Sequence, residues 1–206
     1  MRLIWLLLLA VPALLAEPKI TFIKSFPKST PAYVRIEVSK SGDAVFRDSN
    51  EDDQAISFRV KQDEVQVLFG LAEKVNHFSA PLESNLKVAF MGEKTLRWED
   101  GSVKNEAKFN YTLDENARLL VDWFDRITET QMLLFDLERT ARFDRLGVNH
   151  TLLQIEAASD RGRLVSRERF LPLLERVAKN DSYLHMARER AASLAEAFRA
   201  AKPKAE

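Results

Sequence analysis

Hydrophobic and polar residues alternate in short runs through the first half of the chain, with the two-residue period of half-buried β-strands. Residues 33–38 are the clearest run, because Val34, Ile36 and Val38 share one face. The runs that predict strands in this region are residues 20–23, 33–38, 44–46 and 56–60. A turn at Ser41-Gly42-Asp43 joins the second and third runs, which therefore form a hairpin.

The spacing changes to a helical period after the fourth predicted strand. Residues 62–76 carry one broad apolar stripe, which predicts an amphipathic helix. The stripe consists of Val65, Leu68, Phe69, Leu71, Ala72 and Val75. A helix with one apolar face buries that face against a neighbour, so we expect it to lie across the sheet.

A second hairpin is predicted over residues 94–111. Asp100-Gly101 separates two alternating runs and supplies the positive φ angles of a two-residue turn. This turn places Glu99 opposite Ser102, and Trp98 across from Val103 on the same face of the sheet.

The rest of the chain shows helical spacing. Thr112 to Glu115 matches a capping box, and the helix that follows carries a seam of alternating three- and four-residue spacing. The seam comprises Leu120, Trp123, Ile127, Thr130, Leu134, Leu137 and Ala141. One long helix accounts for this pattern, although a new cap at residues 128–131 would divide it. Gly147 has the position of a left-handed residue that ends a helix.

Three shorter helices are expected at residues 149–158, 166–179 and 182–201. No Pro- or Gly-rich linker separates the strand-rich and helical regions, so we expect them to be docked on each other. The predicted class is α+β: a small antiparallel sheet with a packed helix, followed by an all-helical C-terminal region. The predicted division is a signal peptide at 1–16, a β-rich domain at 17–112, a helical region at 113–201 and a disordered tail at 202–206.

The first sixteen residues predict export. Arg2 precedes an apolar run, and Pro12 leads to an exit that ends in a small residue, which is the pattern of a cleavable signal peptide. The run is shorter than the ~20 residues of a spanning helix, although a retained membrane tether is the alternative. Cleavage after Ala16 places Leu14 where a small residue is preferred, so Ala13 is a second candidate cleavage site.

Charge and cysteine content exclude several classes of protein. The chain has 31 Lys plus Arg and 31 Asp plus Glu, and this balance argues against nucleic-acid binding and against electrostatic docking to anionic lipid. It contains no cysteine, which excludes a disulfide framework, a thiol nucleophile and a thiolate metal site. We predict no cofactor and no membrane span in the mature chain.

One acidic loop carries the only metal candidate. Asp48, Asn50 and Asp52 stand at alternate positions, where oxygen ligands can converge on Ca²⁺. Asp53 replaces the glycine of the sharp turn, and Arg59 occupies the position of the closing glutamate. A solvated acidic turn is therefore the favoured interpretation over a calcium site.

Motifs for catalysis are incomplete. Ser25-x-x-Lys28 and Ser84-x-x-Lys87 have the spacing of a lysine-activated serine, but the partner motifs of such enzymes are missing. The three histidines are far apart in the sequence. These motifs read as chance matches.

The chain resembles a family of uncharacterised exported bacterial proteins of acidobacterial type that contain a domain of unknown function. The similarity rests on Pro31-x-Tyr33, the hairpin around Gly42, the helix ending at Phe78, and residues 94–111. It implies an exported α+β protein and transfers no catalytic residue. Residues 170–195, with Asp181, Arg188 and Ala191, also resemble one HEAT-type helix pair; a single pair forms a helical hairpin and not a solenoid.

These observations favour a non-enzymatic periplasmic or secreted protein that binds a protein or glycan partner of the cell envelope. The alternative is an envelope hydrolase whose site combines dispersed Asp, Glu, Ser and His residues. A third interpretation makes the seam of the long helix a homodimer interface.

Overall fold

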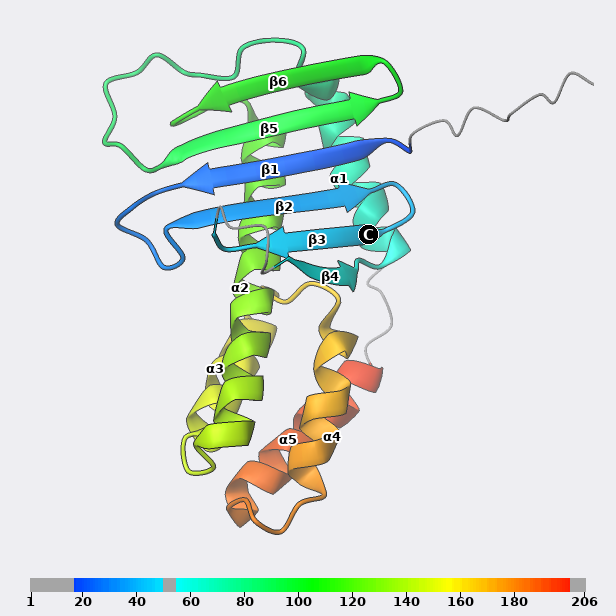
Figure 1. Cartoon of the computed structure of the whole chain (residues 1–206), viewed down its shortest axis with the longest axis vertical. Coiled ribbons are helices and arrows are strands. Elements are labelled where there is room, and N and C mark those ends of the chain that lie inside the picture. The colour runs from blue at the N-terminus through cyan, green and yellow to red at the C-terminus, as the bar shows by residue number, and fades with distance from the viewer. Residues whose placement is uncertain (1–16, 50–54, 201–206) are drawn as a thin grey trace, which may run out of the picture.

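The computed structural model describes residues 17–49 and 55–200, so the predicted signal peptide and the C-terminal tail lie outside the described residues. Six antiparallel strands form one sheet in the order β4-β3-β2-β1-β5-β6 (Figure 1). The strands are β1 (Lys19–Ser25), β2 (Tyr33–Ser39), β3 (Asp43–Arg47), β4 (Ile56–Arg59), β5 (Glu93–Asp100) and β6 (Val103–Phe109). The β5–β6 hairpin thus adds to one side of β1, and the β1–β4 meander extends from its other side.

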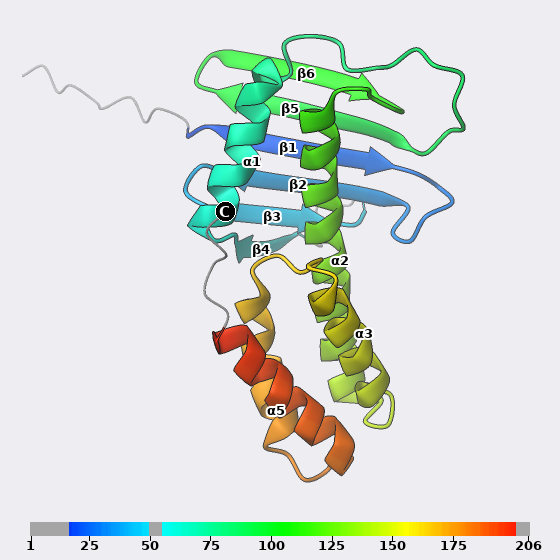
Figure 2. The ribbon, with the colours of Figure 1, turned by 180° about the vertical axis from the view of Figure 1, so that it is seen from behind.

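Helices cover one face of the sheet and then continue past its β4 edge, as Figure 2 shows. The helices are α1 (Gln62–Lys74), α2 (Glu115–Phe143), α3 (Val148–Asp160), α4 (Leu171–Ala178) and α5 (His185–Ala200), with short 3₁₀ turns η2 (Asn76–Phe78) and η3 (Arg167–Phe170). The predicted α+β class is confirmed. Among the described helices, none combines the length and apolar content that a membrane span requires.

Alternation along the strands produces the sheet core. Ile20 and Phe22 of β1 point to the helix-covered face and are fully buried, and the ring of Phe22 stacks on that of Phe124 of α2 at 4.9 Å. Val65, Leu68 and Ala72 of α1 join the same core, so this helix lies across the sheet as its apolar stripe predicts.

The second hairpin has the predicted strands with a different register. Asp100 pairs with Val103 and Trp98 with Asn105, so the turn is Gly101-Ser102 and the predicted pairing of Trp98 with Val103 is wrong by two residues. Gly101 takes the positive φ of +55° as the first residue of the loop. A shift of two residues keeps each side chain on its predicted face.

Two predicted ends of the long helix are also corrected. Asp114, not Thr112, is the N-cap of α2, because its carboxylate accepts the Ala117 N–H at 2.8 Å. Gly147 has φ of −70° and begins α3. Glycine is needed here because there is no room for a side chain. A Cβ at position 147 would lie 2.1 Å from the Asp144 carboxylate, which accepts the Gly147 N–H.

Helix α2 is continuous and belongs to two cores. Its first half, with Leu120, Phe124 and Ile127, packs on the sheet, whereas Leu134 and Leu137 pack against α3, α4 and α5. The cores therefore meet within α2. Most of the helical seam is buried against the rest of the chain, and only Trp123 and Ala141 are partly buried, so the structure gives no support to the predicted homodimer interface along it.

A polar joint connects the sheet layer to the helical bundle. Ser166, with φ of +47°, donates its N–H and its hydroxyl to the Glu64 carboxylate of α1 at 2.9 and 2.5 Å. The Val165 N–H donates to the Thr130 hydroxyl at 3.0 Å, and Arg169 donates to Gln131 at 2.6 Å. These bonds tie the segment after α3 to both α1 and α2.

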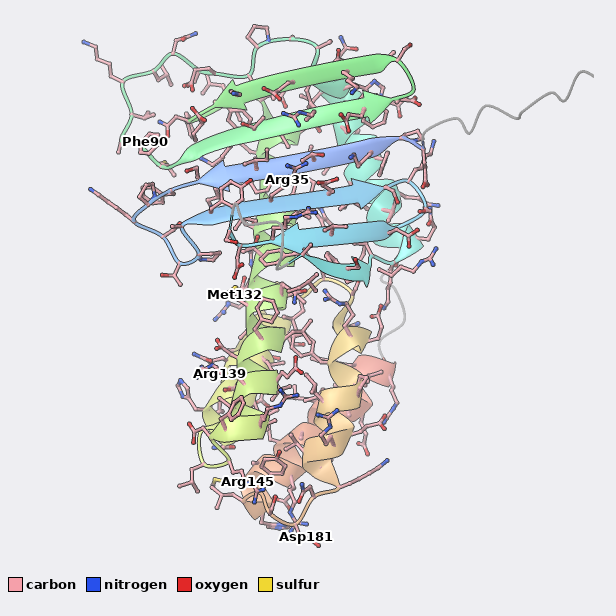
Figure 3. All side chains as sticks on the ribbon, in the orientation of Figure 1. Arg35, Phe90, Met132, Arg139, Arg145 and Asp181 are labelled. Atoms are coloured by element: carbon pink, nitrogen blue, oxygen red, sulfur yellow. The ribbon has the colours of Figure 1, made fainter. Side chains whose placement is uncertain are left out.

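The other face of the sheet carries ion pairs and no covering helix (Figure 3). Lys19 bridges Glu37 and Glu99 at 2.9 and 3.1 Å, and Arg97 pairs with Glu106 at 2.5 Å. Burial opposes the ionisation of Glu37, but the hydrogen bond and charge of Lys19 outweigh it, so the pKa of the Glu37 carboxyl is lowered.

Candidate binding groove

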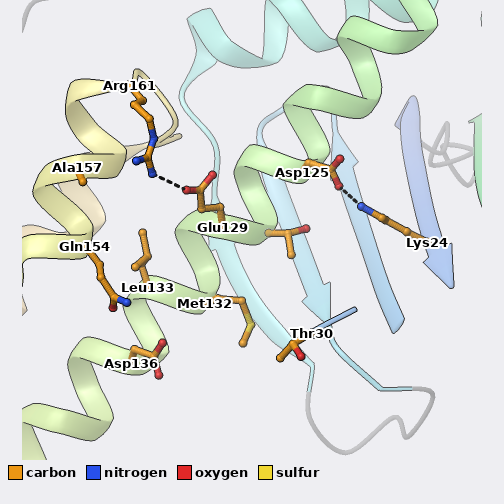
Figure 4. Close-up of a pocket in the computed structure, with 11 residues that line it drawn as sticks. Lys24, Thr30, Asp125, Glu129, Met132, Leu133, Asp136, Gln154, Ala157 and Arg161 are labelled. Carbon is orange, nitrogen blue, oxygen red and sulfur yellow. Dashed lines mark hydrogen bonds and ion pairs between the residues drawn. The ribbon is translucent and has the colours of Figure 1, made fainter. Parts of the chain in front are cut away.

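An open groove of about 580 Å³ runs along one side of α2 (Figure 4). Helix α2 forms one wall of the groove, and the end of β1, the β1–β2 loop and α3 form the others. The lining residues are Lys24, Thr30, Asp125, Thr128, Glu129, Met132, Leu133, Asp136, Gln154, Ala157 and Arg161. Six of them come from α2 at helical spacing and so form one stripe of that helix.

Charged side chains of the groove are held by partners within the chain. Lys24 of β1 pairs with Asp125 at 2.8 Å, which fixes one end of the groove against the sheet. Glu129 pairs with Arg161 at 3.7 Å and with Arg163 at 2.9 Å. Figure 4 shows these carboxylates facing the groove from α2. Arg163 also pairs with Asp122 at 2.5 Å, so it ties the segment after α3 to α2 beside the groove.

The opposite end of the groove is less constrained. Asp136 pairs with Arg139 across one turn of α2 at 2.9 Å, and both side chains are largely exposed. Met132 and Leu133 supply an apolar floor between the two charged ends, and the exposed Ala157 of α3 leaves space above it. A flexible thioether such as that of Met132 adapts its shape to different partners.

The arrangement offers contact surface and hydrogen-bonding groups without an assembled reactive centre. The groove lining contains no histidine, serine or cysteine; its reactive groups are the amine of Lys24, the hydroxyls of Thr30 and Thr128, and three carboxylates. A general acid needs a carboxyl that keeps its proton near neutral pH, and carboxylates that already pair with Lys or Arg are poor candidates. The chemistry that the groove supports best is binding.

The predicted calcium candidate is only partly visible. Asp48 follows β3 in the described chain, whereas Asn50 and Asp52 lie outside the described residues. Within the described ranges, 17–49 and 55–200, no group of three or more His, Asp or Glu side chains could hold a metal ion.

The remaining candidates from the sequence are dispersed over the surface. The Ser84 hydroxyl donates to Glu83 at 3.3 Å, and Ser25 ends β1 far along the chain from it. His77 packs against Trp98 at 4.2 Å, and His185 pairs with Glu189 at 3.1 Å. Among the described contacts, neither serine bonds to the lysine of its own motif, and the groove contains none of these residues.

Sequence reasoning missed the groove as a site. The only signal in the sequence was a second stripe on the long helix, in which Asp125, Glu129 and Asp136 alternate with Met132 and Leu133. Such a mixed stripe has neither the polarity of a solvated face nor the apolar content of a core face. Its charged members resemble the ion-paired positions of an ordinary exposed helix surface.

Comparison with known proteins adds no assignment. No protein-family model matches the chain, and no curated protein matches it.

Proposed function

We propose that this chain is an exported, non-enzymatic binding protein, and that the groove along α2 accepts an extended segment of a protein partner from the cell envelope. The observation that carries the proposal is the groove itself: an apolar floor between two charged ends, with its carboxylates already paired. Export rests on the signal pattern of residues 1–16, and membership of the uncharacterised exported family remains a proposal of the same kind.

A protein segment fits the groove better than a glycan does. Met132 and Leu133 offer apolar contact, and the ends offer carboxylates and cations that complement the side chains of a peptide. Charged rims of this kind set specificity and orientation, while buried apolar contacts supply affinity. A glycan ligand is retained as an outcome of the experiment.

The test is to block the groove without disturbing the fold. Ala157→Trp fills the groove from α3, where the side chain is exposed. Ala197→Trp makes the same change at an exposed position of α5 outside the groove and is the matched control. We expect envelope extract to yield a partner with the wild type and with Ala197→Trp, and a partner reduced at least about tenfold with Ala157→Trp.

Equal capture by all three proteins would contradict the groove as the binding site. The rival hydrolase hypothesis is tested on the same preparations with peptide, ester, phosphate and glycoside substrates. Turnover that one substitution of Asp125, Glu129 or Asp136 abolishes would replace the binding proposal with an enzymatic one.

A further inference from the structure

The end of the sheet where β1 ends and β5 begins presents an unusual run of exposed apolar side chains. Residues 85–91 are all exposed, and this apolar loop carries Leu86, Val88, Phe90 and Met91. The Phe90 side chain is 60% exposed and projects outward from this end of the sheet in Figure 3. Surface residues of this size usually occur singly, so a contiguous group marks a contact site.

The loop is held in place by groups that are themselves costly to bury. The ammonium of Lys94 is buried and donates to the carbonyl oxygens of Met91, Gly92 and Asn110 at 3.3, 3.0 and 2.9 Å. Burial lowers the pKa of Lys94, and the nearby charge of Lys24 adds to that effect. Burial of a charged group is unfavourable unless it is hydrogen-bonded, and the three bonds of Lys94 hold the base of the loop in position.

Asn110 fixes the loop at a second place. Its side-chain oxygen accepts the Met91 N–H at 2.7 Å, and its side-chain nitrogen donates to the Ala89 carbonyl at 3.1 Å. Gly92 has φ of +91° and no space for a Cβ, because one would lie 2.8 Å from Phe26. The loop is therefore a preorganised feature and does not fold back onto the protein.

The surroundings of the loop are convex and carry positive charge. Phe26 of the β1–β2 loop packs edge-on against Phe90 at 6.0 Å, which joins the two loops into one surface. Lys28 and Lys87 are exposed on these loops, against one exposed carboxylate, that of Glu93. The apolar side chains of the loop line neither the groove along α2 nor the smaller hollows at residues 74–84, 37–45 and 59–62, and Phe90 projects from the end of the sheet.

We infer that residues 85–91, together with Phe26 and Lys28, dock the protein on an anionic lipid surface. A stable protein interface buries about 800 Å² on each partner, which a projecting seven-residue loop does not supply by itself. A bilayer interface requires only several apolar side chains that reach the acyl boundary and cations that meet the headgroups. The balanced charge of the whole chain argues against docking by net attraction alone, so the apolar side chains supply the main contribution here and the exposed Lys28 and Lys87 supply the preference for anionic headgroups.

The bundle tip provides a matched comparison surface. Phe143 and Leu146 are 77% and 75% exposed there, so their apolar exposure exceeds that of the loop residues. Asp144 and the exposed Arg145 stand between these two apolar residues on the α2–α3 connection, so their charges largely cancel and give the tip no net attraction for anionic lipid.

The experiment measures flotation of the exported full chain with vesicles of phosphatidylglycerol and phosphatidylcholine, and with vesicles of phosphatidylcholine alone. We expect tighter binding to the anionic vesicles and weakening by added salt. Leu86→Ser combined with Phe90→Ser should weaken binding at least about tenfold. Phe143→Ser combined with Leu146→Ser should leave it unchanged.

A local readout separates the loop from any other part of the chain that meets lipid. The fluorescence of the wild-type tryptophans, which include Trp98 and Trp123, is subtracted as the reference. The added signal of Phe90→Trp should shift to the blue when anionic vesicles are present, and that of Phe143→Trp should not. Absence of wild-type binding, binding that survives the loop substitutions, or a shift at residue 143 alone would each overturn the inference. Loop-dependent dimerisation in light scattering without vesicle binding would overturn it in favour of a second copy of this chain. The groove proposal stands or fails separately, because Ala157→Trp does not alter the loop.

Discussion

The sheet layer and the helical bundle share α2 but are stabilised by different kinds of packing. Phe22, Phe46, Phe78 and Phe124 are among the largest fully buried side chains and all belong to the sheet core. Alanine makes up a larger share of the bundle core, with four of its sixteen buried residues, than of the sheet core, with four of twenty-five, although Phe170 is fully buried in the bundle as well. The buried alanines of the bundle are Ala158, Ala187, Ala191 and Ala195. Small residues let helices approach closely, whereas large rings fill the space between a sheet and its helices. The two regions should therefore respond to opposite changes of side-chain volume.

Removal of volume should have its largest effect in the sheet core. Phe124→Ala deletes a fully buried ring that stacks on Phe22 at 4.9 Å. We expect the free energy of unfolding to fall by about 3–5 kcal/mol in urea titrations. A loss below about 1 kcal/mol would contradict the description of this core as tightly packed.

The polar joint determines whether the two regions unfold together. In the wild type the Glu64 carboxylate accepts hydrogen bonds from the Ser166 N–H and hydroxyl. Glu64→Gln keeps the shape of the side chain, but its amide NH₂ is a donor and cannot accept these bonds. The expected loss of unfolding free energy is about 1.5–3 kcal/mol.

The same variant should separate the two regions in thermal unfolding. Trp98 and Trp123 lie in the sheet half, so near-ultraviolet circular dichroism reports on that half, while the far-ultraviolet signal is dominated by helices. The two transitions should coincide in the wild type and separate in Glu64→Gln. Coincident transitions in the variant would show that the cores of α2 are sufficient to couple the regions.

Addition of volume should disturb the bundle. Ala191 of α5 is fully buried, and Ala191→Leu should cost about 1–3 kcal/mol because the helices must move apart. Ala197→Leu makes the same change at an exposed position of the same helix and should be nearly neutral. Equal effects of the two substitutions would show that α5 is not closely packed.

The smallest effect is expected on the open face of the sheet. The pKa of Glu37 is lowered, so its ionised form stabilises the fold above the unfolded pKa, and this contribution is lost as the pH falls through the lowered folded value. Glu37→Gln should cost less than about 1 kcal/mol at neutral pH because the pair is close to solvent. The difference from wild type should vanish in acid; a difference that persists there would assign the effect to packing.

Local periodicity predicted most of the fold. The alternation of Val34, Ile36 and Val38 and the apolar stripe of residues 62–76 depend on one element each, and both are confirmed. The predicted pairing of the second hairpin differs from the observed register by two residues, because Asp100-Gly101 and Gly101-Ser102 are both acceptable two-residue turns. Hydrogen bonds between residues three positions apart set the start of α2 and the start of α3: the Ala117 N–H donates to Asp114, and the Gly147 N–H donates to Asp144. Thr112 and Asp114 are both acceptable N-cap residues, so the sequence pattern alone did not choose between them.

The candidate sites were less predictable for a physical reason. The groove combines side chains from β1, the β1–β2 loop, α2 and α3, which are brought together only by the docking of the bundle on the sheet. The apolar loop was similarly hidden, since Leu86, Val88 and Phe90 read as part of a strand or core until their exposure is known. The hydrophobic pattern of an element predicts which of its faces is buried. It does not predict which apolar residues the neighbouring elements leave exposed.

Site-specific photo-cross-linking from Thr128, in the middle of the groove, tests the central claim of a protein-binding groove most directly. A photoreactive residue at position 128, with one at the exposed position 196 of α5 as control, is introduced into the chain and irradiated in the native envelope. The account predicts a protease-sensitive adduct of discrete mass from position 128 alone, abolished by Ala157→Trp. No adduct at position 128, the same adduct from both positions, or an adduct that resists protease and yields to glycosidase would contradict it.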